Sequence, residues 1–356
     1  MENQISFEHK EKSNDWKWTM KNDYPQEKNG LTVFSCFSCG GSTMGYKLAG
    51  CDVIGNCEID KRMNEVYINN HHPKFNFCMD IREFNKLPNN ELPKELFNLD
   101  ILDGSPPCTT FSMAGEREKS WGKKKKFREG QTEQTLDDLS FVFIDTVAKL
   151  KPKFAVMENV EGLLLGNAWT YVQKIYEKFK LSGYYVKHYL CKAENMGVPQ
   201  KRHRVFFIAA RYDMNFDFDN LDMYFNYEPV LYGEIKSGNG TEINKSTQYY
   251  KMLCKATPQD HSISDVIERL GGKKRCFNAK IIWENEVCPT VTAKCELYRG
   301  KEKSKISTQD IIYAQTFPTD YIFPNNRIST ISYICGMSVP PVMTKRIVQR
   351  IIKNMR

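Results

Sequence analysis

The chain has 356 residues, 41% of them hydrophobic, so it can bury a sizeable core. We expect two domains, because a single core rarely grows past about 250 to 300 residues. The 51 Lys and Arg residues against 43 Asp and Glu give a net charge of +8, which fits an anionic partner such as nucleic acid. No run reaches the roughly 18 consecutive apolar residues of a membrane helix, and no apolar signal region follows the polar start. We therefore expect a monomer in the cytoplasm, with no membrane partner.

The cysteines indicate neither a disulfide framework nor a metal site. The chain has twelve cysteines without dense regular spacing, so we expect reduced thiols. Cys36 and Cys39 have the C-x-x-C spacing of a zinc ligand pair, but no second pair completes four ligands. The adjacent His71 and His72 lack further ligands for the same reason, and we expect no bound metal.

The first part of the chain predicts an α/β fold. Residues 1–30 are polar and end in Asn29-Gly30, which indicates a loosely attached arm with one short helix. After the arm, short apolar runs alternate with stretches whose apolar residues are three and four apart. This alternation predicts a doubly wound, mostly parallel sheet. The predicted strands are 31–37, 53–57, 99–102, 154–157, 185–190 and 205–210, and the predicted helices are 44–49, 63–69, 137–150 and 170–181.

The second part of the chain differs in composition and in the regularity of its apolar residues. Residues 213 to about 285 mix aromatic, Asn, Gly and charged residues with little regular period, which indicates a separate, smaller and irregular domain. We place the large domain at 31–212 and the smaller domain at 213–325. A helix-like tail at 341–352 lies in a C-terminal segment, 326–356, which we expect to return to the large domain.

A glycine-rich turn and an acid suggest a cofactor site. Phe37-Ser38-Cys39-Gly40-Gly41 lies between the first strand and the first helix, where doubly wound folds bring their backbone close to a nucleotide-like ligand. Glu58 follows the second strand, where an acid commonly bonds ribose hydroxyls. The pairing favours an adenosine-containing cofactor, and the absence of G-x-G-x-x-G argues against NAD. The alternative is a glycine pair that only turns the chain.

Two reactive side chains follow predicted strands. Cys108 comes after Pro106 and Pro107, which fix two φ angles and hold the thiol on a rigid path at the carboxyl end of a strand. It is either a nucleophile or an inert buried thiol. Glu158 directly follows the strand 154–157, where its carboxylate can exchange a proton or remain a solvated acid in a turn.

Three groups of cations complete the candidate residues. Gln200-Lys201-Arg202-His203-Arg204 opens the strand 205–210 and is either an anion site or a solvated strand entrance. The runs 123–126 and 273–275 are basic, and each is either a nucleic-acid contact or a solvated loop.

Six motifs, taken in order after the glycine-rich turn, resemble those of the cytosine-5 DNA methyltransferases. They are "GSPPC", "ENV", "VPQKRHRVFFIAAR", "CPTVTAK" at 288–294, "AQTFPTDY" at 314–321 and "GMSVPP" at 336–341. The likeness spans about residues 31–350. Two motifs depart from the family pattern: "FSCGG" is one residue shorter than F-x-G-x-G-G, and the segment around Gly336 lacks the amides of Q-x-G-N. Both departures concern cofactor packing.

The resemblance implies a S-adenosylmethionine-dependent methyltransferase fold with catalytic and target-recognition domains. It implies S-adenosylmethionine as methyl donor, S-adenosylhomocysteine as product, and a cytosine flipped out of double-stranded DNA as acceptor. Cys108 would attack carbon 6 of the base, Glu158 would bond nitrogen 3 and the amino group, and Arg204 with Arg202 would hold the base or its phosphate. The residues implied at the DNA backbone are Thr109, Lys123, Lys124, Lys125, Lys126 and Arg128.

The resemblance also implies a set of cofactor contacts. Aromatic and glycine residues of the first turn would surround the methionine portion, and the acids after the next two strands would face the ribose and adenine. The implied cofactor residues are Phe37, Gly40, Gly41, Glu58, Ile59, Asp80, Ile81, Pro106, Leu139, Ser338 and Val339. The leading interpretation is a bacterial or phage restriction-modification enzyme. A tRNA cytosine-5 methyltransferase and a catalytically silent DNA-binding relative are the alternatives.

Overall fold

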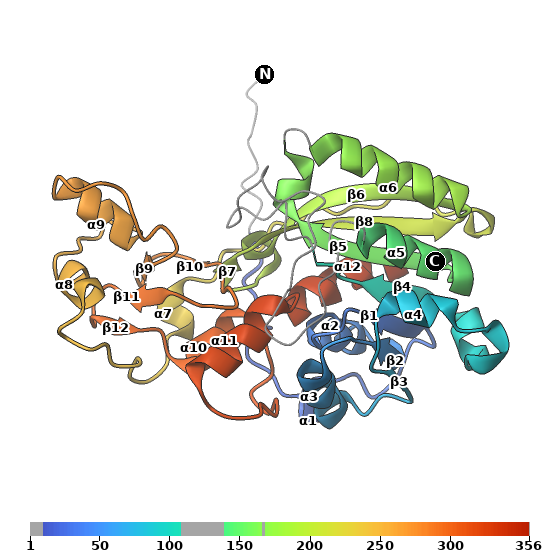
Figure 1. Cartoon of the computed structure of the whole chain (residues 1–356), viewed down its shortest axis with the longest axis horizontal. Coiled ribbons are helices and arrows are strands. Elements are labelled where there is room, and N and C mark those ends of the chain that lie inside the picture. Colours follow the sequence, from blue (N-terminus) through green and yellow to red (C-terminus); the bar gives the residue numbers. More distant parts are fainter. Residues whose placement is uncertain (1–9, 108–138, 166–167, 356) are drawn as a thin grey trace, which may run out of the picture.

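A computed structural model describes residues 10–107, 139–165 and 168–355. Figure 1 shows a large lobe around a central sheet and a smaller lobe that holds β9, β11, β12, α8 and α9. The strands of the large sheet are β1 (Thr32–Cys36), β2 (Asp52–Cys57), β3 (Phe75–Phe77), β4 (Ile101–Gly104), β5 (Phe154–Val160), β6 (Tyr184–Lys192) and β8 (His203–Arg211). The main helices are α2 (Gly41–Leu48), α3 (Lys61–His71), α4 (Ile81–Lys86), α5 (Leu139–Leu150), α6 (Trp169–Leu181), α11 (Ile328–Met337) and α12 (Pro341–Asn354).

The remaining elements are short. They are α1 (Met20–Asp23), α7 (Tyr232–Ile235), α8 (Gln248–Cys254), α9 (Ile263–Arg269), α10 (Thr308–Ala314), β7 (Gln200–Lys201), β9 (Lys280–Ile282), β10 (Cys288–Pro289), β11 (Leu297–Arg299) and β12 (Ser304–Lys305). Single 3₁₀ turns are η1 (Asn89–Glu91), η2 (Lys94–Asn98), η4 (Glu161–Leu164), η6 (Ala193–Met196) and η7 (Tyr212–Met214).

The central sheet has seven strands in the order β3-β2-β1-β4-β5-β8-β6. β3, β2, β1, β4 and β5 are parallel, whereas β8 runs antiparallel to both β5 and β6. The prediction of a doubly wound, mostly parallel α/β sheet is confirmed. β4 begins two residues later than the predicted strand 99–102, and just before it the Asp100 carboxylate accepts hydrogen bonds from Thr32 and Lys153.

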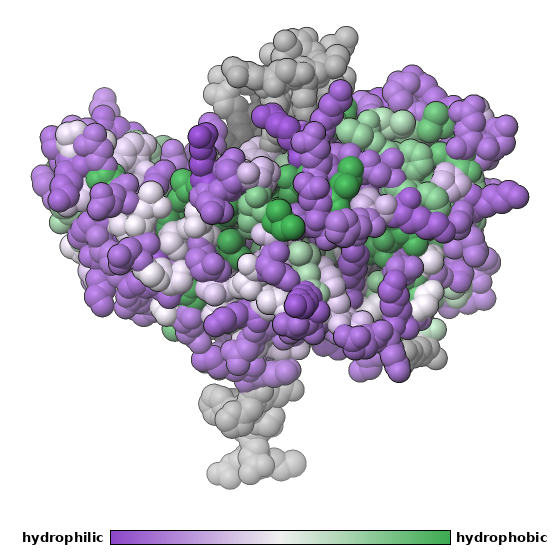
Figure 2. All heavy atoms as spheres, turned by 90° about the horizontal axis from the view of Figure 1, so that it is seen from below, coloured by the Kyte–Doolittle hydropathy of each residue, from purple (hydrophilic) through white to green (hydrophobic). Residues whose placement is uncertain are grey.

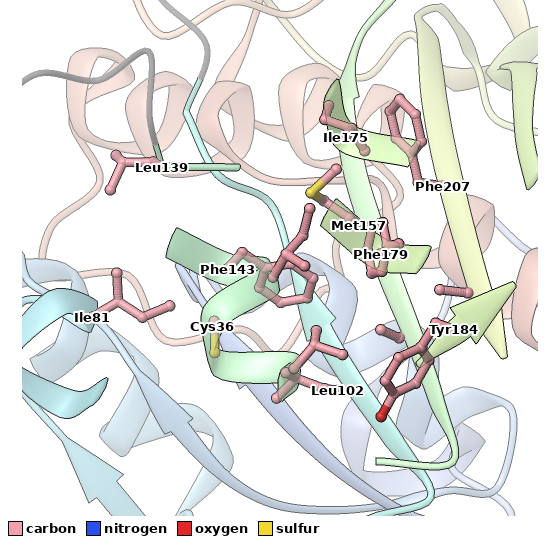
Figure 3. Close-up of a cluster of buried hydrophobic side chains, with 14 of the residues drawn as sticks. Cys36, Ile81, Leu102, Leu139, Phe143, Met157, Ile175, Phe179, Tyr184 and Phe207 are labelled. Atoms are coloured by element: carbon pink, nitrogen blue, oxygen red, sulfur yellow. The ribbon is translucent and has the colours of Figure 1, made fainter. Parts of the chain in front are cut away.

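Alternate residues of the strands face two helical layers. One face packs against α4, α5 and α6, as Figure 3 shows for Phe143, Ile175 and Phe179 beside Leu102 and Met157. The other face packs against α2 and α12, with Ile101, Phe154, Val342, Ile347 and Tyr46 in one cluster. Burial on both faces explains why these strands are nearly continuous apolar runs in the sequence.

The register of the parallel strands aligns their carboxyl ends. Cys36 of β1 pairs with Gly104 of β4, and Gly104 pairs with Met157 of β5. The residues that follow these three strands therefore emerge at one edge of the sheet. Ligands of open α/β sheets bind outside this edge.

The N-terminal arm packs more tightly than the sequence predicted. The indole of Trp18 is 5% exposed and donates to the Thr316 carbonyl over 2.8 Å. Arg346 of α12 donates to the Ser13 hydroxyl over 2.8 Å and stacks on Tyr227. The expectation of loose attachment is therefore wrong for residues 10–30, although the single short helix, α1, is present.

The smaller lobe has its own packing. Its three-stranded sheet, ordered β12-β11-β9, carries a cluster that includes Leu253, Val266 and Ile281. Beside it, the buried guanidinium of Arg299 bonds Asp310 and the hydroxyl of Tyr232. Chain segment 214–227 contributes Leu221 and Phe225 to the packing of the large sheet instead.

The surface in Figure 2 is mostly hydrophilic, with hydrophobic residues in small groups. None of the helices in the described part of the chain is both long and apolar enough to cross a bilayer. Among the same residues, no three His, Cys, Asp or Glu side chains gather as a metal-binding group.

Candidate active site

A cavity of about 380 Å³ lies at the carboxyl edge of the central sheet. Its walls include the turns after β1, β2, β3 and β4, the carboxyl end of β5, Arg202 and Arg204 at the start of β8, residues 290–293, and α11. Segments more than 200 residues apart in the sequence thus meet around one space, at the edge where this class of sheet places ligands.

Most of the predicted cofactor residues lie on the wall of this cavity. The lining includes Phe37, Glu58, Ile59, Asp80, Ile81, Pro106 and Leu139. Glu58 follows β2 directly, is 8% exposed, and accepts the backbone N–H of Asp60 over 2.7 Å. Asp80 caps the first turn of α4 by accepting the N–H of Arg82 over 2.8 Å. Both carboxylates are therefore held in place by the backbone.

The glycine pair and the Ser338-Val339 pair lie behind the cavity and do not line it. A Cβ added to Gly41 would come within 2.1 Å of the Val339 carbonyl oxygen, so only glycine fits there. Gly40 has a φ of +89°, in the left-handed region that favours glycine. Ser338 donates its hydroxyl to the Cys39 carbonyl over 3.2 Å. These residues join the glycine turn to the segment between α11 and α12.

Glu158 and Arg204 form an ion pair on the cavity wall. The Nε of Arg204 lies 2.8 Å from Oε1 of Glu158, and the two side chains are 17% and 12% exposed. They meet because β5 and β8 are antiparallel neighbours, with Val160 opposite Arg204. Nη1 of Arg204 also donates to the His203 carbonyl over 2.7 Å.

Arg202 points away from this pair, although its side chain also reaches the cavity wall. Its Nη1 donates to the Val291 carbonyl over 3.1 Å, and its Nη2 donates to the Gly336 carbonyl over 3.2 Å. Burial and the neighbouring charge of Arg204 lower the pKa of Arg202. In this structure Arg202 ties β8 to two segments that close the cavity from the C-terminal part of the chain.

The loop that carries the predicted nucleophile borders the same cavity. Ser105, Pro106 and Pro107 line it, and the side-chain amide of Asn159 donates to the Pro106 carbonyl over 3.5 Å. Pro107 is the last residue described before the gap at 108–138. Cys108, Thr109, Lys123, Lys124, Lys125, Lys126 and Arg128 lie outside the described residues.

Asp103 is a buried acid that the sequence analysis did not single out. Its carboxylate accepts hydrogen bonds from Ser35 and Ser42, each over 2.7 Å, and from Tyr46 over 3.3 Å. Burial raises its pKa to about 6, against the opposing effect of these hydroxyls. The sequence did offer one sign of a buried acid here, because Asp103 lies between Leu102 and Gly104 at the end of an apolar run.

Several other lining residues were also missed. They carry no charge and were not singled out as site residues, although Cys39, Val160 and Met337 lie in the glycine-rich turn and in the "ENV" and "GMSVPP" motifs. They are Cys39, Met63, Met79, Val160, Tyr333 and Met337. Thr290, Val291, Thr292 and Ala293 also line the cavity, and they lie within the "CPTVTAK" motif.

The sheet order, the antiparallel strand β8 and the cavity define an α/β protein with a ligand-sized space at the carboxyl edge of a mostly parallel sheet. A family model described as C-5 cytosine-specific DNA methylase matches residues 31–353. The chain belongs to this family, and it is a DNA cytosine methyltransferase by that membership, as the sequence predicted.

Individual relatives match over nearly the whole chain. The Type II methyltransferase M1.HphI of Haemophilus parahaemolyticus is 24% identical over 91% of this chain and 87% of its own length. The Type II methyltransferase M.HindV of Haemophilus influenzae is 27% identical over 88% of this chain and 93% of its own length. A mutant of Spodoptera frugiperda DNMT2 has a similar fold, with a TM-score of 0.64, 16% identity, and coverage of 91% of this chain and 100% of that one.

Proposed function

We propose that this protein transfers a methyl group from S-adenosylmethionine to carbon 5 of a cytosine flipped out of double-stranded DNA, through a covalent adduct with Cys108. The observation that carries the proposal is the ion pair of Glu158 and Arg204 on the cavity wall, 2.8 Å apart and beside Pro107. The next residue in the sequence is Cys108, the thiol of the "GSPPC" motif.

The cavity fits the proposed cofactor in size and chemistry. The carboxylates of Glu58 and Asp80 suit hydroxyl and amino groups of an adenosine portion, and Phe37, Ile59 and Ile81 offer apolar surface to its rings. Gly40 and Gly41 would act indirectly, by shaping the turn that begins at Phe37. When bound, S-adenosylmethionine supplies an electrophilic methyl group on a positively charged sulfur.

The side chains of this chain account for the activation of cytosine. Carbon 5 of cytosine is a poor nucleophile, so the Cys108 thiolate forms a bond to carbon 6 and the displaced electron pair makes carbon 5 nucleophilic. Glu158 bonds ring nitrogen 3 and the amino group, and stabilises the charge shift during this attack. Arg204 keeps Glu158 oriented and favours the thiolate by its positive field. After methylation, loss of the carbon 5 proton returns its electron pair to the ring and expels Cys108.

DNA binding is assigned to the basic residues and to the smaller lobe. Flipping the base costs a few kcal/mol, which backbone contacts from Thr109, the basic run 123–126 and Arg128 would help to offset. The region 213–325 would read base edges as a target-recognition domain, with 31–212 and 326–356 as the catalytic part. Because the proposed substrate is DNA, we propose that the protein acts in the bacterial cytoplasm. That it is a monomer stays a prediction.

The proposal is tested by incubating the protein with tritiated S-adenosylmethionine and either mixed-sequence duplex DNA or total tRNA. Digestion to nucleosides should show 5-methylcytosine from the DNA, and Cys108→Ser should abolish it. Methylation of tRNA alone would favour the RNA alternative. Label on adenine, or no transfer to either substrate, would overturn the proposal. Bisulfite sequencing of DNA from expressing cells would then give the target site.

A further inference from the structure

His203 joins the ends of three neighbouring strands at the edge of the active site. It is the first residue of β8, and its ring contacts carboxylates on both sides. Nδ1 lies 3.1 Å from Oε2 of Glu161, which begins η4 directly after β5. Nε2 lies 2.8 Å from Oε1 of Glu194, which lies in η6 directly after β6. One imidazole ring thus connects the segments that flank β8.

With both carboxylates ionised, both contacts are hydrogen bonds only when both ring nitrogens carry protons. An ionised carboxylate accepts hydrogen bonds but cannot donate them, and a neutral imidazole has a single donor nitrogen. A neutral ring would therefore turn one lone pair toward one of the two carboxylates. The side chains of His203, Glu161 and Glu194 are 30%, 36% and 16% exposed, so solvent screens the charges in part. With both carboxylates ionised, this geometry favours a doubly protonated ring at His203.

His203 also contacts the ion pair of Glu158 and Arg204, through its backbone. The carbonyl of His203 accepts Nη1 of Arg204 over 2.7 Å, and Nε of Arg204 lies 2.8 Å from Glu158. His203 therefore provides both the ring that contacts the two carboxylates and the carbonyl that orients the guanidinium of Arg204. Glu161 follows Val160, the residue paired with Arg204 across β5 and β8. A shift of either flanking segment would change the spacing between Glu158 and Arg204.

We propose that protonated His203 is a positioning residue for the methyl-transfer reaction. It fixes the start of β8 against the ends of β5 and β6, and so holds Arg204 against Glu158 while Glu158 supports attack on the base. The kinetic part rests on the proposed function, whereas the protonation of the ring does not. Loss of the contacts of His203 with Glu161 and Glu194 should lower kcat. The KM values for DNA and cofactor should stay nearly unchanged, because none of these three side chains lines the cavity.

The kinetic test uses a substitution and its rescue. In His203→Gln the amide has one donor group and one acceptor, so one carboxylate faces an oxygen atom. We expect kcat to fall about tenfold, the equivalent of one charge-assisted hydrogen bond, with KM values within about twofold of wild type. Adding Glu161→Gln supplies an amide donor for that oxygen and should return kcat to within about threefold of wild type.

The matched control is His188→Gln. His188 lies on β6, where its Nδ1 is 2.8 Å from the Tyr176 hydroxyl; it pairs with Phe207, whereas Cys191 of β6 pairs with Arg204. Its substitution should leave kcat unchanged. A kcat for His203→Gln equal to that of wild type or of His188→Gln would overturn the kinetic part, and so would a double variant that shows no recovery.

A spectroscopic test needs no activity and therefore separates this inference from the proposed function. The full chain is labelled with ¹⁵N-histidine, and the His203 signals are assigned by their disappearance in His203→Gln. At the pH of the assay we expect both ring nitrogens of His203 to have the shifts of a charged imidazolium. A neutral tautomer would overturn the inference even if methyl transfer proceeds.

Discussion

Replacing Glu158 with glutamine should separate its chemistry from its structural contact. The amide oxygen of Glu158→Gln can still accept the Nε–H of Arg204, which lies 2.8 Å from the carboxylate in the wild type. Packing should therefore persist around a side chain that is 12% exposed. The substitution removes the negative charge and the ability to take and return a proton, so kcat should fall by about 10²- to 10⁴-fold. Removal of the partner in Arg204→Met costs one charge-assisted hydrogen bond and should lower kcat by about 10- to 100-fold.

The assay is single-turnover methyl transfer at saturating DNA and S-adenosylmethionine, so that weaker binding is not mistaken for slower chemistry. The control is Glu83→Gln, which removes an exposed ion pair with Lys86 on α4 and should leave the rate unchanged. Thermal unfolding verifies that each variant is folded. A Glu158→Gln rate within about threefold of wild type would refute the assignment of proton chemistry to this residue.

Three further predictions concern stability and DNA binding. The pKa of buried Asp103, about 6, lies above the ordinary aspartate value of about 3.9, so the wild-type protein loses stability as the pH rises through 6. Asp103→Asn lacks this ionisation. Between pH 4 and pH 7 its unfolding free energy, measured by urea titration, should therefore rise by about 2 to 3 kcal/mol relative to that of wild type. Arg299→Met leaves the carboxylate of Asp310 buried and unpaired, and should lower the unfolding free energy by about 3 to 5 kcal/mol, whereas the exposed control Lys86→Met should change it by less than about 1 kcal/mol. Replacing the lysines of the basic run 123–126 with glutamine should weaken the salt dependence of DNA binding. The slope of log Kd against the logarithm of the salt concentration should fall by about 0.9 for each phosphate that the variant no longer neutralises. An unchanged slope would contradict backbone binding by this run.

The sequence predicted the parts of the fold and site that depend on local patterns. The apolar runs and the helical periodicity located β1, β2, β5, β8, α5 and α6, because each element buries a face whose period is visible in the sequence. The glycine turn could be found because it directly follows β1, and Glu158 because it follows the predicted strand 154–157, although β5 continues to Val160. The family resemblance then connected Cys108, Glu158 and Arg204, which no spacing rule relates.

The features that sequence reasoning missed depend on packing between distant segments. Trp18 donates to a carbonyl 298 residues away, so its polar surroundings in the sequence indicated a loose arm. The antiparallel direction of β8 has no signature in an apolar run that is buried on both faces. Tyr333 and Met337 reach the cavity only because α12 returns the C-terminal segment to α2, beside the glycine turn. Long-range packing, not local propensity, decided these positions.

The measurement that tests the central claim most directly is covalent trapping on mixed-sequence duplex DNA in which 5-fluorocytosine replaces cytosine. Fluorine at carbon 5 cannot leave as a proton does, so the reaction should stop after methyl transfer, with the protein still bonded to carbon 6 of the base. In the presence of S-adenosylmethionine, we predict a stable protein–DNA adduct whose peptide map assigns the bond to Cys108, and no adduct with Cys108→Ser. An adduct at another cysteine, or methylated DNA without any adduct, would contradict the account.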